Sequence, residues 1–447
     1  MKHYDIVIIG GGAGGISALK NCSRLYPNKS KALIKKERNT LIPCAIPYVY
    51  GELGSSQNNL VSNDIISKFN ADLICDEVEY IDHRNKVLKL KTSETIEYDK
   101  LVLATGSSPI KPAIKGVEKG NIYYVKKEAE SIDNLNERIR SSNNIVIVGG
   151  GYIGVEYAEH IKDFSPEKNV TIVEVEERCL HHSMDEEFTK EIEDKLKYVG
   201  INILKGKSVK AFTRSNNASK VKLSNNNEVD YDLAIVGVGF MPEASLAKNS
   251  GIKIGDTQAV WVDSYMRTSA KDVFACGDCA QKYSFFTKKE ANAILASIAS
   301  VEGRIVAENL YENHFSNPGV IGIFSTKIHG KVFSSCGYNL KDVQNEQLGV
   351  LIGNAVVTNR HPSNIGGGGK IAVKLIFESK RKILIGAQVS GPQEVSELIN
   401  MLGVAIERKM NIYDLHMLQV ATQPKLTASP VAYPIISACE DALRKDI

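Results

Sequence analysis

Two glycine-rich turns, each lying between an apolar run and a helical pattern, constrain the fold of this chain more than any other feature. The first follows the apolar run 4–9 and the second follows the run 144–148. Both have the spacing G-x-G-x-x-G, in which backbone N–H groups at a helix N-terminus cradle a dinucleotide pyrophosphate. One such motif is weak evidence, but two in the same setting predict two dinucleotide sites. The glycines are Gly10, Gly12 and Gly15 in the first turn and Gly149, Gly151 and Gly154 in the second.

The residue that ends the next strand differs between the two units. In the second unit the strand 170–173 ends in Glu174, 20 residues after Gly154. A carboxylate there accepts hydrogen bonds from ribose hydroxyls and repels a 2′-phosphate, which predicts NADH rather than NADPH. A solvated strand-end glutamate is the alternative. In the first unit, the residue 20 positions after Gly15 is Lys35, whose ammonium group cannot accept a hydrogen bond. The ribose of the first dinucleotide is therefore held either by Lys35 or by the nearby Glu37.

Cys44 lies about 30 residues after the first glycine turn, in the run PCAIPY. We expect it at the start of a helix, where the helix dipole would stabilise a thiolate. A cysteine held there beside a bound dinucleotide suggests a flavin that passes electrons to a single cysteine. The alternative is a buried structural cysteine.

Two further strand ends support the dinucleotide interpretation. The run 101–103 ends in the tight turn Ala104-Thr105-Gly106, and the run 273–275 ends in Cys276-Gly277-Asp278. Asp278 is placed to hold a ribityl or phosphate-side hydroxyl. Cys276 and Cys279 form a C-x-x-C pair, but without a second pair or nearby histidines it is weak evidence for zinc, and no metal is expected.

Composition excludes several classes of function. A chain of 447 residues suggests about three domains, and its 43% hydrophobic and 24% charged residues are typical of a soluble globular protein. The net charge of +3 indicates neither nucleic acid nor a membrane surface as partner. The eight cysteines are scattered, and no signal peptide or membrane-spanning run is recognised, which predicts a cytoplasmic protein with mostly reduced thiols.

The last third of the chain, from about residue 322, has a different pattern. Alternating runs at 370–377 and 383–389 predict strands, and 394–409 predicts a helix, so this part forms a separate α+β domain. The glycine run 366–369 precedes a strand rather than a helix and is therefore predicted to be a turn.

Over essentially its whole length the chain resembles the flavin-dependent pyridine nucleotide–disulfide oxidoreductase superfamily. It is most similar to the single-cysteine branch that contains coenzyme A disulfide reductase, NADH oxidases and NADH peroxidase. The resemblance implies an α/β fold with two Rossmann-like domains, for FAD and NAD, and a C-terminal α+β dimerisation domain in a homodimer. The FAD-binding domain would cover 1–112 and 245–321, the NAD(P)H-binding domain 113–244, and the dimerisation domain 322–447.

The resemblance also implies roles for single residues. Cys44 would form a sulfenate or a mixed disulfide beside the flavin, and Val49 stands where two-cysteine members have their second cysteine. The backbone of Val78 would meet the flavin adenine. Tyr152 would be the gate between flavin and nicotinamide, and Glu156 the carboxylate beside the nicotinamide. The alternatives are that Tyr152 packs at the helix start and that Glu156 only pairs with the dipole in the first helical turn.

Departures from the family pattern bear on the substrate. A histidine in the first glycine loop of the peroxidase and oxidase types is replaced by Ala13, as in the coenzyme A disulfide reductases. Ser17, Asn21 and Arg24 lie at i, i+4 and i+7, so they share one helix face. The resemblance implies that this face holds the coenzyme A nucleotide; an ordinary solvated face is the alternative.

A second departure concerns the general acid. Gln423-Pro424 replaces the His-Pro pair that carries it in disulfide reductases of the glutathione type. Tyr433 and His361 are the candidates to replace that histidine.

Three functions follow from these patterns. The preferred one is an NADH-dependent reductase of a disulfide, persulfide or polysulfide, including coenzyme A-based substrates. The alternative is an NADH oxidase, in which dioxygen is reduced and the cysteine cycles through a sulfenate. The third is a flavin electron-transfer or redox-signalling protein that binds a protein partner, which would leave Cys44 without a role.

Overall fold

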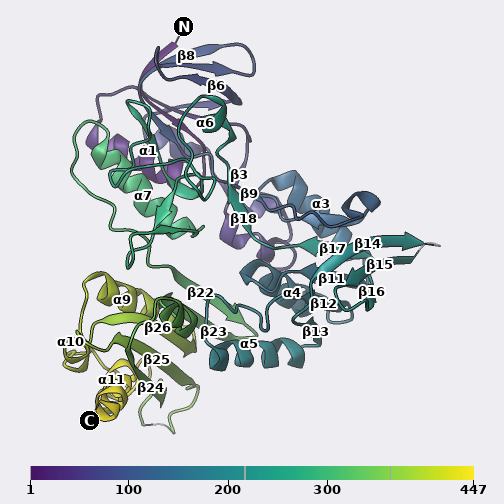
Figure 1. Ribbon diagram of the computed structural model, residues 1–447, viewed down its shortest axis with the longest axis vertical. Coiled ribbons are helices and arrows are strands. Elements are labelled where there is room, and N and C mark those ends of the chain that lie inside the picture. Colours follow the sequence, from purple (N-terminus) through teal and green to yellow (C-terminus); the bar gives the residue numbers. More distant parts are fainter. Residues whose placement is uncertain (1, 216–217, 363, 447) are drawn as a thin grey trace. The chain divides into compact units, whose positions relative to one another are not determined.

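The computed structural model describes residues 2–215, 218–362 and 364–446, and the chain divides into two compact units (Figure 1). The first unit contains 1–113, 120–142 and 235–320, and the second contains 114–119, 143–234 and 321–447. The predicted second domain, 113–244, is therefore shared between the units, because 120–142 and 235–244 pack with the first. The predicted three-domain boundaries stay a prediction.

The first unit is built on a parallel sheet in which β5, β2, β1 and β8 are neighbours, and β19 pairs in parallel with β8. Strands β7 and β6 continue the sheet in antiparallel order. The strands are β1 (Lys2–Ile9), β2 (Lys31–Lys35), β3 (Thr40–Leu41), β4 (Leu60–Val61), β5 (Asp72–Cys75), β6 (Val78–Asp82), β7 (Val87–Leu90), β8 (Thr95–Leu103), β9 (Ser107–Pro109), β10 (Ile122–Tyr124), β18 (Phe240–Pro242), β19 (Val273–Ala275), β20 (Lys282–Tyr283) and β21 (Glu290–Ala291). The helices are α1 (Ala13–Leu25), α2 (Asp64–Lys68), α3 (Ala129–Ser141), α6 (Ser245–Asn249) and α7 (Ala296–Asn309).

The predicted strand 4–9 is confirmed, since it forms most of β1. Ile6, Val7 and Ile8 of this strand are fully buried in the core of the sheet. Helices α1 and α7 lie side by side against it (Figure 1). Gly303 allows this close packing, since a Cβ atom there would lie 2.4 Å from the carbonyl oxygen of Gly14.

The second unit begins with the parallel strands β11, β12 and β13, connected by α4 and α5. It continues with a five-stranded antiparallel sheet in the order β22-β23-β26-β25-β24. The strands are β11 (Asn144–Val148), β12 (Asn169–Val173), β13 (Ile201–Leu204), β14 (Val209–Ser215), β15 (Ala218–Leu223), β16 (Glu228–Asp230), β22 (Ile323–Ile328), β23 (Lys331–Gly337), β24 (Val350–Thr358), β25 (Lys370–Glu378) and β26 (Leu384–Gly391). The helices are α4 (Tyr152–Phe164), α5 (Glu186–Tyr198), α8 (Leu340–Asn345), α9 (Val395–Glu407), α10 (Ile412–His416) and α11 (Pro434–Lys445). Strand β17 (Leu233–Val236) contains the point where the chain passes back into the first unit.

The sequence predictions for the C-terminal third are confirmed within a few residues as β25, β26 and α9, and the glycine run precedes β25 as expected. A buried polar cluster joins this part to the β11–β13 segment. The Asp185 carboxylate accepts hydrogen bonds from Gln388 Nε2 (2.8 Å) and the Leu340 N–H (2.9 Å), and forms an ion pair with Lys374 Nζ (2.7 Å). These contacts explain why two segments far apart in the chain form one unit.

Among the described residues, no helix combines the length and apolar character that crossing a membrane requires.

Candidate active site

The first glycine turn is a close-packed cradle at the N-terminus of α1. Gly10 has φ +113°, and a Cβ atom on it would lie 2.0 Å from the Ala104 carbonyl oxygen. A Cβ on Gly15 would lie 2.0 Å from the Gly10 carbonyl oxygen. Gly12, in contrast, has open space above it and no side chain caps α1. The first N–H groups of α1 are therefore left for an anion, as a bound pyrophosphate requires.

The predicted strand ends meet at this cradle. Gly14 would place a Cβ 3.4 Å from both the Cys276 sulfur and the Gly277 backbone. The side chain of Thr105 is already engaged, donating to the Glu243 carbonyl at 2.5 Å. The first turn, 104–106 and 276–278, each predicted to bind a dinucleotide, therefore lie together.

Asp278 has two partners that the sequence did not reveal. Its Oδ2 accepts hydrogen bonds from Ser107 Oγ (2.7 Å) and from Lys127 Nζ (2.9 Å). Lys127 also lies over the ring of Phe240, at 4.6 Å from the centroid. These two contacts orient the carboxylate, which suits it to accept a hydrogen bond from a cofactor hydroxyl.

The C-x-x-C pair beside Asp278 is buried. Burial raises the pKa of Cys279 and, more strongly, that of Cys276, so both are held as thiols. Cys279 donates weakly to the Cys276 carbonyl, with the sulfur 3.4 Å from the oxygen.

A buried ion pair holds the backbone of the same turn in place. Lys282 Nζ lies 2.8 Å from Glu302 Oε2 and donates to the Gly277 carbonyl at 2.5 Å. The Gly277 N–H in turn donates to the same Glu302 oxygen at 2.8 Å. Both side chains are at least 95% buried, with 5% and 1% of their surfaces exposed. The pair fixes the backbone from which Asp278 projects.

The two candidates for the first ribose differ in availability. Lys35 is buried and its ammonium donates to Thr40 Oγ1 (3.0 Å) and Asn63 Oδ1 (2.6 Å). Glu37 is exposed beyond the end of β2.

Val78, whose backbone is predicted to meet the flavin adenine, is the first residue of β6, where it pairs with Leu90.

Cys44 lies in a single 3-10 turn, Pro43–Ala45, followed by a second, Pro47–Val49. The expectation that it begins a helix with a useful dipole is wrong, because Pro47 supplies no N–H group to continue one. The thiol is exposed, which rules out the buried structural cysteine. Val49 is fully buried, so the position of the second family cysteine is filled by a core side chain.

The predicted substrate face of α1 is partly covered by α7. Ser17 is 9% exposed and its hydroxyl donates to the Ser300 carbonyl at 2.7 Å. Asn21 donates to the Ser17 carbonyl (2.8 Å), and Arg24 forms an ion pair with Glu308 (2.6 Å) while remaining 61% exposed. This face is not simply solvated, and Ser17 is committed to helix packing.

The second glycine turn repeats the first. A Cβ on Gly154 would lie 1.9 Å from the Gly149 carbonyl oxygen, whereas Gly151 has open space above it and α4 has no side-chain cap. Glu174 is 8% exposed and accepts hydrogen bonds from the Gly150 N–H and from the Glu176 N–H (2.8 Å). Its carboxylate therefore lies at the turn rather than in solvent, as a ribose acceptor must.

Tyr152 and Glu156 both lie against β22. The ring of Tyr152 stacks on Phe324, with centroids 5.3 Å apart and planes 10° apart. Glu156 accepts a hydrogen bond from Thr326 Oγ1 at 2.9 Å, and burial raises its pKa to about 7. Glu156 is the fifth residue of α4, so the alternative that it is a first-turn dipole partner is wrong.

His361 lies beside the pair that replaces the family's His-Pro. Its N–H donates to the Pro424 carbonyl at 3.1 Å, and its Nδ1 donates to the Thr427 carbonyl at 3.1 Å. Tyr433 stands at the N-cap of α11, and burial raises its pKa. The geometry favours His361 over Tyr433 as the group near residue 424.

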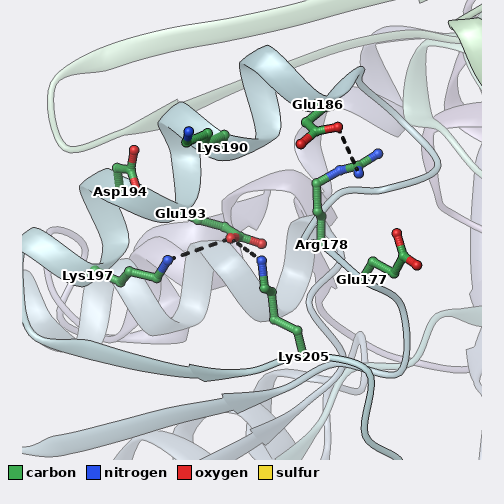
Figure 2. Close-up of a pocket in the computed structure, with 8 residues that line it drawn as sticks. All are labelled: Glu177, Arg178, Glu186, Lys190, Glu193, Asp194, Lys197 and Lys205. Carbon is green, nitrogen blue, oxygen red and sulfur yellow. Dashed lines mark hydrogen bonds and ion pairs between the residues drawn. The ribbon is translucent and has the colours of Figure 1, made fainter.

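A pocket of about 330 Å³ lies beyond the carboxyl ends of β12 and β13 (Figure 2). Glu193 lies between Lys205 and Lys197, with N–O distances of 2.8 and 3.8 Å, and Arg178 faces Glu186 at 3.6 Å (Figure 2). Acidic and basic side chains are equal in number, so the pocket is an ion-pair network rather than an anion site. Its lining residues are Glu177, Arg178, Glu186, Lys190, Glu193, Asp194, Lys197 and Lys205.

Comparison with known families agrees with this geometry. Residues 4–299 match the pyridine nucleotide-disulphide oxidoreductase family, and 325–432 match its dimerisation domain. This chain belongs to that family. It is a flavin-dependent NAD(P)H oxidoreductase with Rossmann-like parallel sheets and a C-terminal dimerisation domain.

Family members with different acceptors are similar to it. An NADH oxidase of Enterococcus faecalis is 28% identical, over 94% of this chain and 95% of that protein. An NAD(P)H coenzyme A polysulfide/persulfide reductase of Pyrococcus horikoshii is 30% identical, over 86% and 87%. The solved structure of an NAD-dependent persulfide reductase from A. fulgidus superimposes with a TM-score of 0.90 at 29% identity, covering 99% of this chain and 83% of that one.

Proposed function

We propose that this oxidoreductase uses NADH to reduce the sulfur–sulfur bond of a disulfide, persulfide or polysulfide, with coenzyme A-based compounds among its substrates. The observation that carries the proposal is the exposed Cys44, in the same unit as the first glycine cradle, with a buried valine where a second cysteine would stand. An accessible thiol with no second cysteine five residues later reacts with an external sulfur. Two of the relatives above have persulfide reductase in their names.

The residues present fit FAD. The turn at Gly10–Gly15 would hold the pyrophosphate, Asp278 a ribityl hydroxyl, and the backbone of Val78 the adenine. When bound, FAD would supply the electron pair that it takes as hydride from the reduced nicotinamide, and that pair would reduce the disulfide formed between a neighbouring cysteine and the substrate, giving two thiolates. NADH would lie on the second turn with its ribose on Glu174.

Cys44 carries the chemistry at sulfur. Its thiolate attacks the sulfur that carries R in R–S–S–R′, a bond forms between Cys44 Sγ and that sulfur, and R′–S⁻ leaves with the electron pair of the broken sulfur–sulfur bond. A proton must reach the departing thiolate. We assign this to His361 because its Nδ1 is held by the Thr427 carbonyl, which leaves Nε2 for proton transfer, and because it lies beside Pro424. In a homodimer, Cys44 and His361 of one active site would come from different subunits.

The exposed edge between α1 and α7 suits a nucleotide-bearing thiol. Arg24 on α1 and Arg304 on α7 are both exposed, and Arg304 Nη1 donates to Ser300 Oγ at 3.1 Å. Asn21 offers a further polar group there. Two guanidinium groups on neighbouring helices favour phosphate groups, which coenzyme A carries and glutathione does not.

Replacing Glu174 by arginine should change the nucleotide preference. Loss of the carboxylate removes the ribose acceptor and its repulsion of a 2′-phosphate, so the NADH/NADPH ratio of kcat/KM should fall by about tenfold or more. Steady-state kinetics with both nucleotides measure this ratio. Glu177→Arg, at the exposed residue that follows Glu176, is the charge-matched control and should leave the ratio near the wild-type value. An unchanged ratio in Glu174→Arg would sink the ribose assignment.

Anaerobic turnover tests the sulfur acceptor. Purified holoenzyme is mixed with NADH and, in turn, with coenzyme A disulfide, coenzyme A persulfide and polysulfide. We expect rapid NADH oxidation with at least one of them in the absence of oxygen. No turnover until air is admitted would make the enzyme an NADH oxidase, which the similarity to the Enterococcus faecalis protein supports as the second candidate.

A further inference from the structure

One face of β22 runs along one face of α4, and two side-chain contacts and one backbone hydrogen bond join them. Side chains two apart in a strand point to the same side, and residues 324, 326 and 328 do so here. Phe324 stacks on Tyr152, Thr326 donates to Glu156, and the N–H of His329, just past the strand, donates to Glu159 at 3.0 Å. The helix residues are at i, i+4 and i+7, which is one helical stripe.

Glu156 is held in a setting that disfavours its charge. The carboxyl is largely removed from water, and the charge of Glu159 on the same helix acts in the same direction. Thr326, itself 6% exposed, supplies the hydrogen bond that opposes both. Of the other titratable groups nearby, Tyr152 is neutral because burial raises its pKa, and Lys327 on β22 acts on Glu159. The Glu156 pKa of about 7 is the balance of these effects.

We propose that Thr326 is a positioning residue for hydride transfer, which orients the Glu156 side chain and stabilises its carboxylate form. This rests on the proposed placement of Glu156 beside the nicotinamide. When hydride leaves the reduced nicotinamide, the ring becomes positively charged, and an adjacent anion lowers the energy of that charge. A strand of the dimerisation segment thereby controls a group in the nucleotide site.

Thr326→Val tests the proposal, because it keeps the branched shape and removes the hydroxyl. The Glu156 pKa should rise by about one unit from its value of about 7, since hydrogen bonds to charged groups are the strong ones. The acid limb of the pH profile for anaerobic flavin reduction by NADH should move up equally. At pH 6 the rate should be about tenfold below wild type, and at pH 9 the two should agree.

The pKa itself is read independently of activity. Holoenzyme carrying ¹³C-carboxyl glutamate is titrated by NMR, and the Glu156 signal is the one missing from Glu156→Gln. Thr326→Ser, which restores a hydroxyl, should return both readouts toward wild type. Thr326→Ala serves if the valine variant does not fold. Ser325→Ala, on the opposite face of β22, where its hydroxyl is 2.6 Å from Ser334 Oγ, is the control and should change neither.

The outcomes separate the two claims. A Glu156 titration and an acid limb that stay in place in both Thr326→Val and Thr326→Ala overturn the role of Thr326. If Glu156→Gln reduces its flavin at the wild-type rate, the placement of Glu156 beside the nicotinamide is wrong, even if Thr326→Val shifts the Glu156 titration. A shifted titration together with a shifted acid limb supports both.

Discussion

Cys44→Ser is expected to reduce anaerobic turnover of the sulfur substrate by about a thousandfold or more while the protein keeps its flavin. A serine hydroxyl is not ionised at neutral pH and is a poor nucleophile toward sulfur, so the mixed disulfide cannot form. The exposed position of Cys44, outside the hydrophobic core, means that the substitution should leave folding intact. Steady-state NADH oxidation measures turnover, and the visible absorbance of the protein measures flavin content.

Cys75 provides a matched control. It is the other exposed cysteine, at the end of β5 in the same unit, and no role is assigned to it. Cys75→Ser should therefore turn over at the wild-type rate. If Cys44→Ser reduced the sulfur substrate as fast as Cys75→Ser, the thiol mechanism would be wrong, because reduction would then bypass the cysteine.

Removing one partner of the Lys282–Glu302 pair is expected to cost about 3–5 kcal/mol in the free energy of unfolding of the first unit. Lys282→Met fills the same volume but leaves the Glu302 carboxylate buried without its cation, together with the Gly277 and Ala280 carbonyls that the ammonium now satisfies. Urea unfolding followed through flavin release reports on this unit, since the two units need not unfold together.

The double variant Lys282→Met/Glu302→Leu distinguishes a paired charge from simple packing. With both charges gone, the remaining cost should be much smaller than that of Lys282→Met alone. Lys271→Met, at an exposed lysine of the same unit, should change the midpoint little. A single variant as stable as the Lys271→Met control would show that the ion pair does not brace the Asp278 turn.

Backbone geometry explains what the sequence could predict. Carbonyl oxygens leave no room for a Cβ atom at Gly10, Gly15 and Gly154, and Gly149 has a φ of +106°, so the spacing of these glycines is visible without a structure. Apolar strands buried on both faces are recognisable for a similar reason. The two cradles, the strand ends that meet them and the C-terminal α+β segment followed from these signals.

The side-chain partners could not be predicted, because they depend on tertiary contacts between distant residues. Lys127 with Asp278 and Thr326 with Glu156 lie 151 and 170 residues apart, and no period or motif links them. The local expectation for Cys44 failed for a different reason: the position favoured a helix start, but Pro47 limits each helical segment to one turn.

The Asp185 cluster and the β22–α4 contacts have a consequence for how such enzymes can be recombined. Residues 143–234 and 321–447 satisfy each other's buried charges, although 86 residues of another unit separate them in the chain. A chimera could take its nucleotide segment from one relative and its dimerisation segment from another. Carboxylates such as Asp185 and Glu159 would then lose the hydrogen bonds and the ion pair that they form with the dimerisation segment. The unit of exchange in this chain is therefore discontinuous: it is cut at three points, 142/143, 234/235 and 320/321, and its two segments are transferred together.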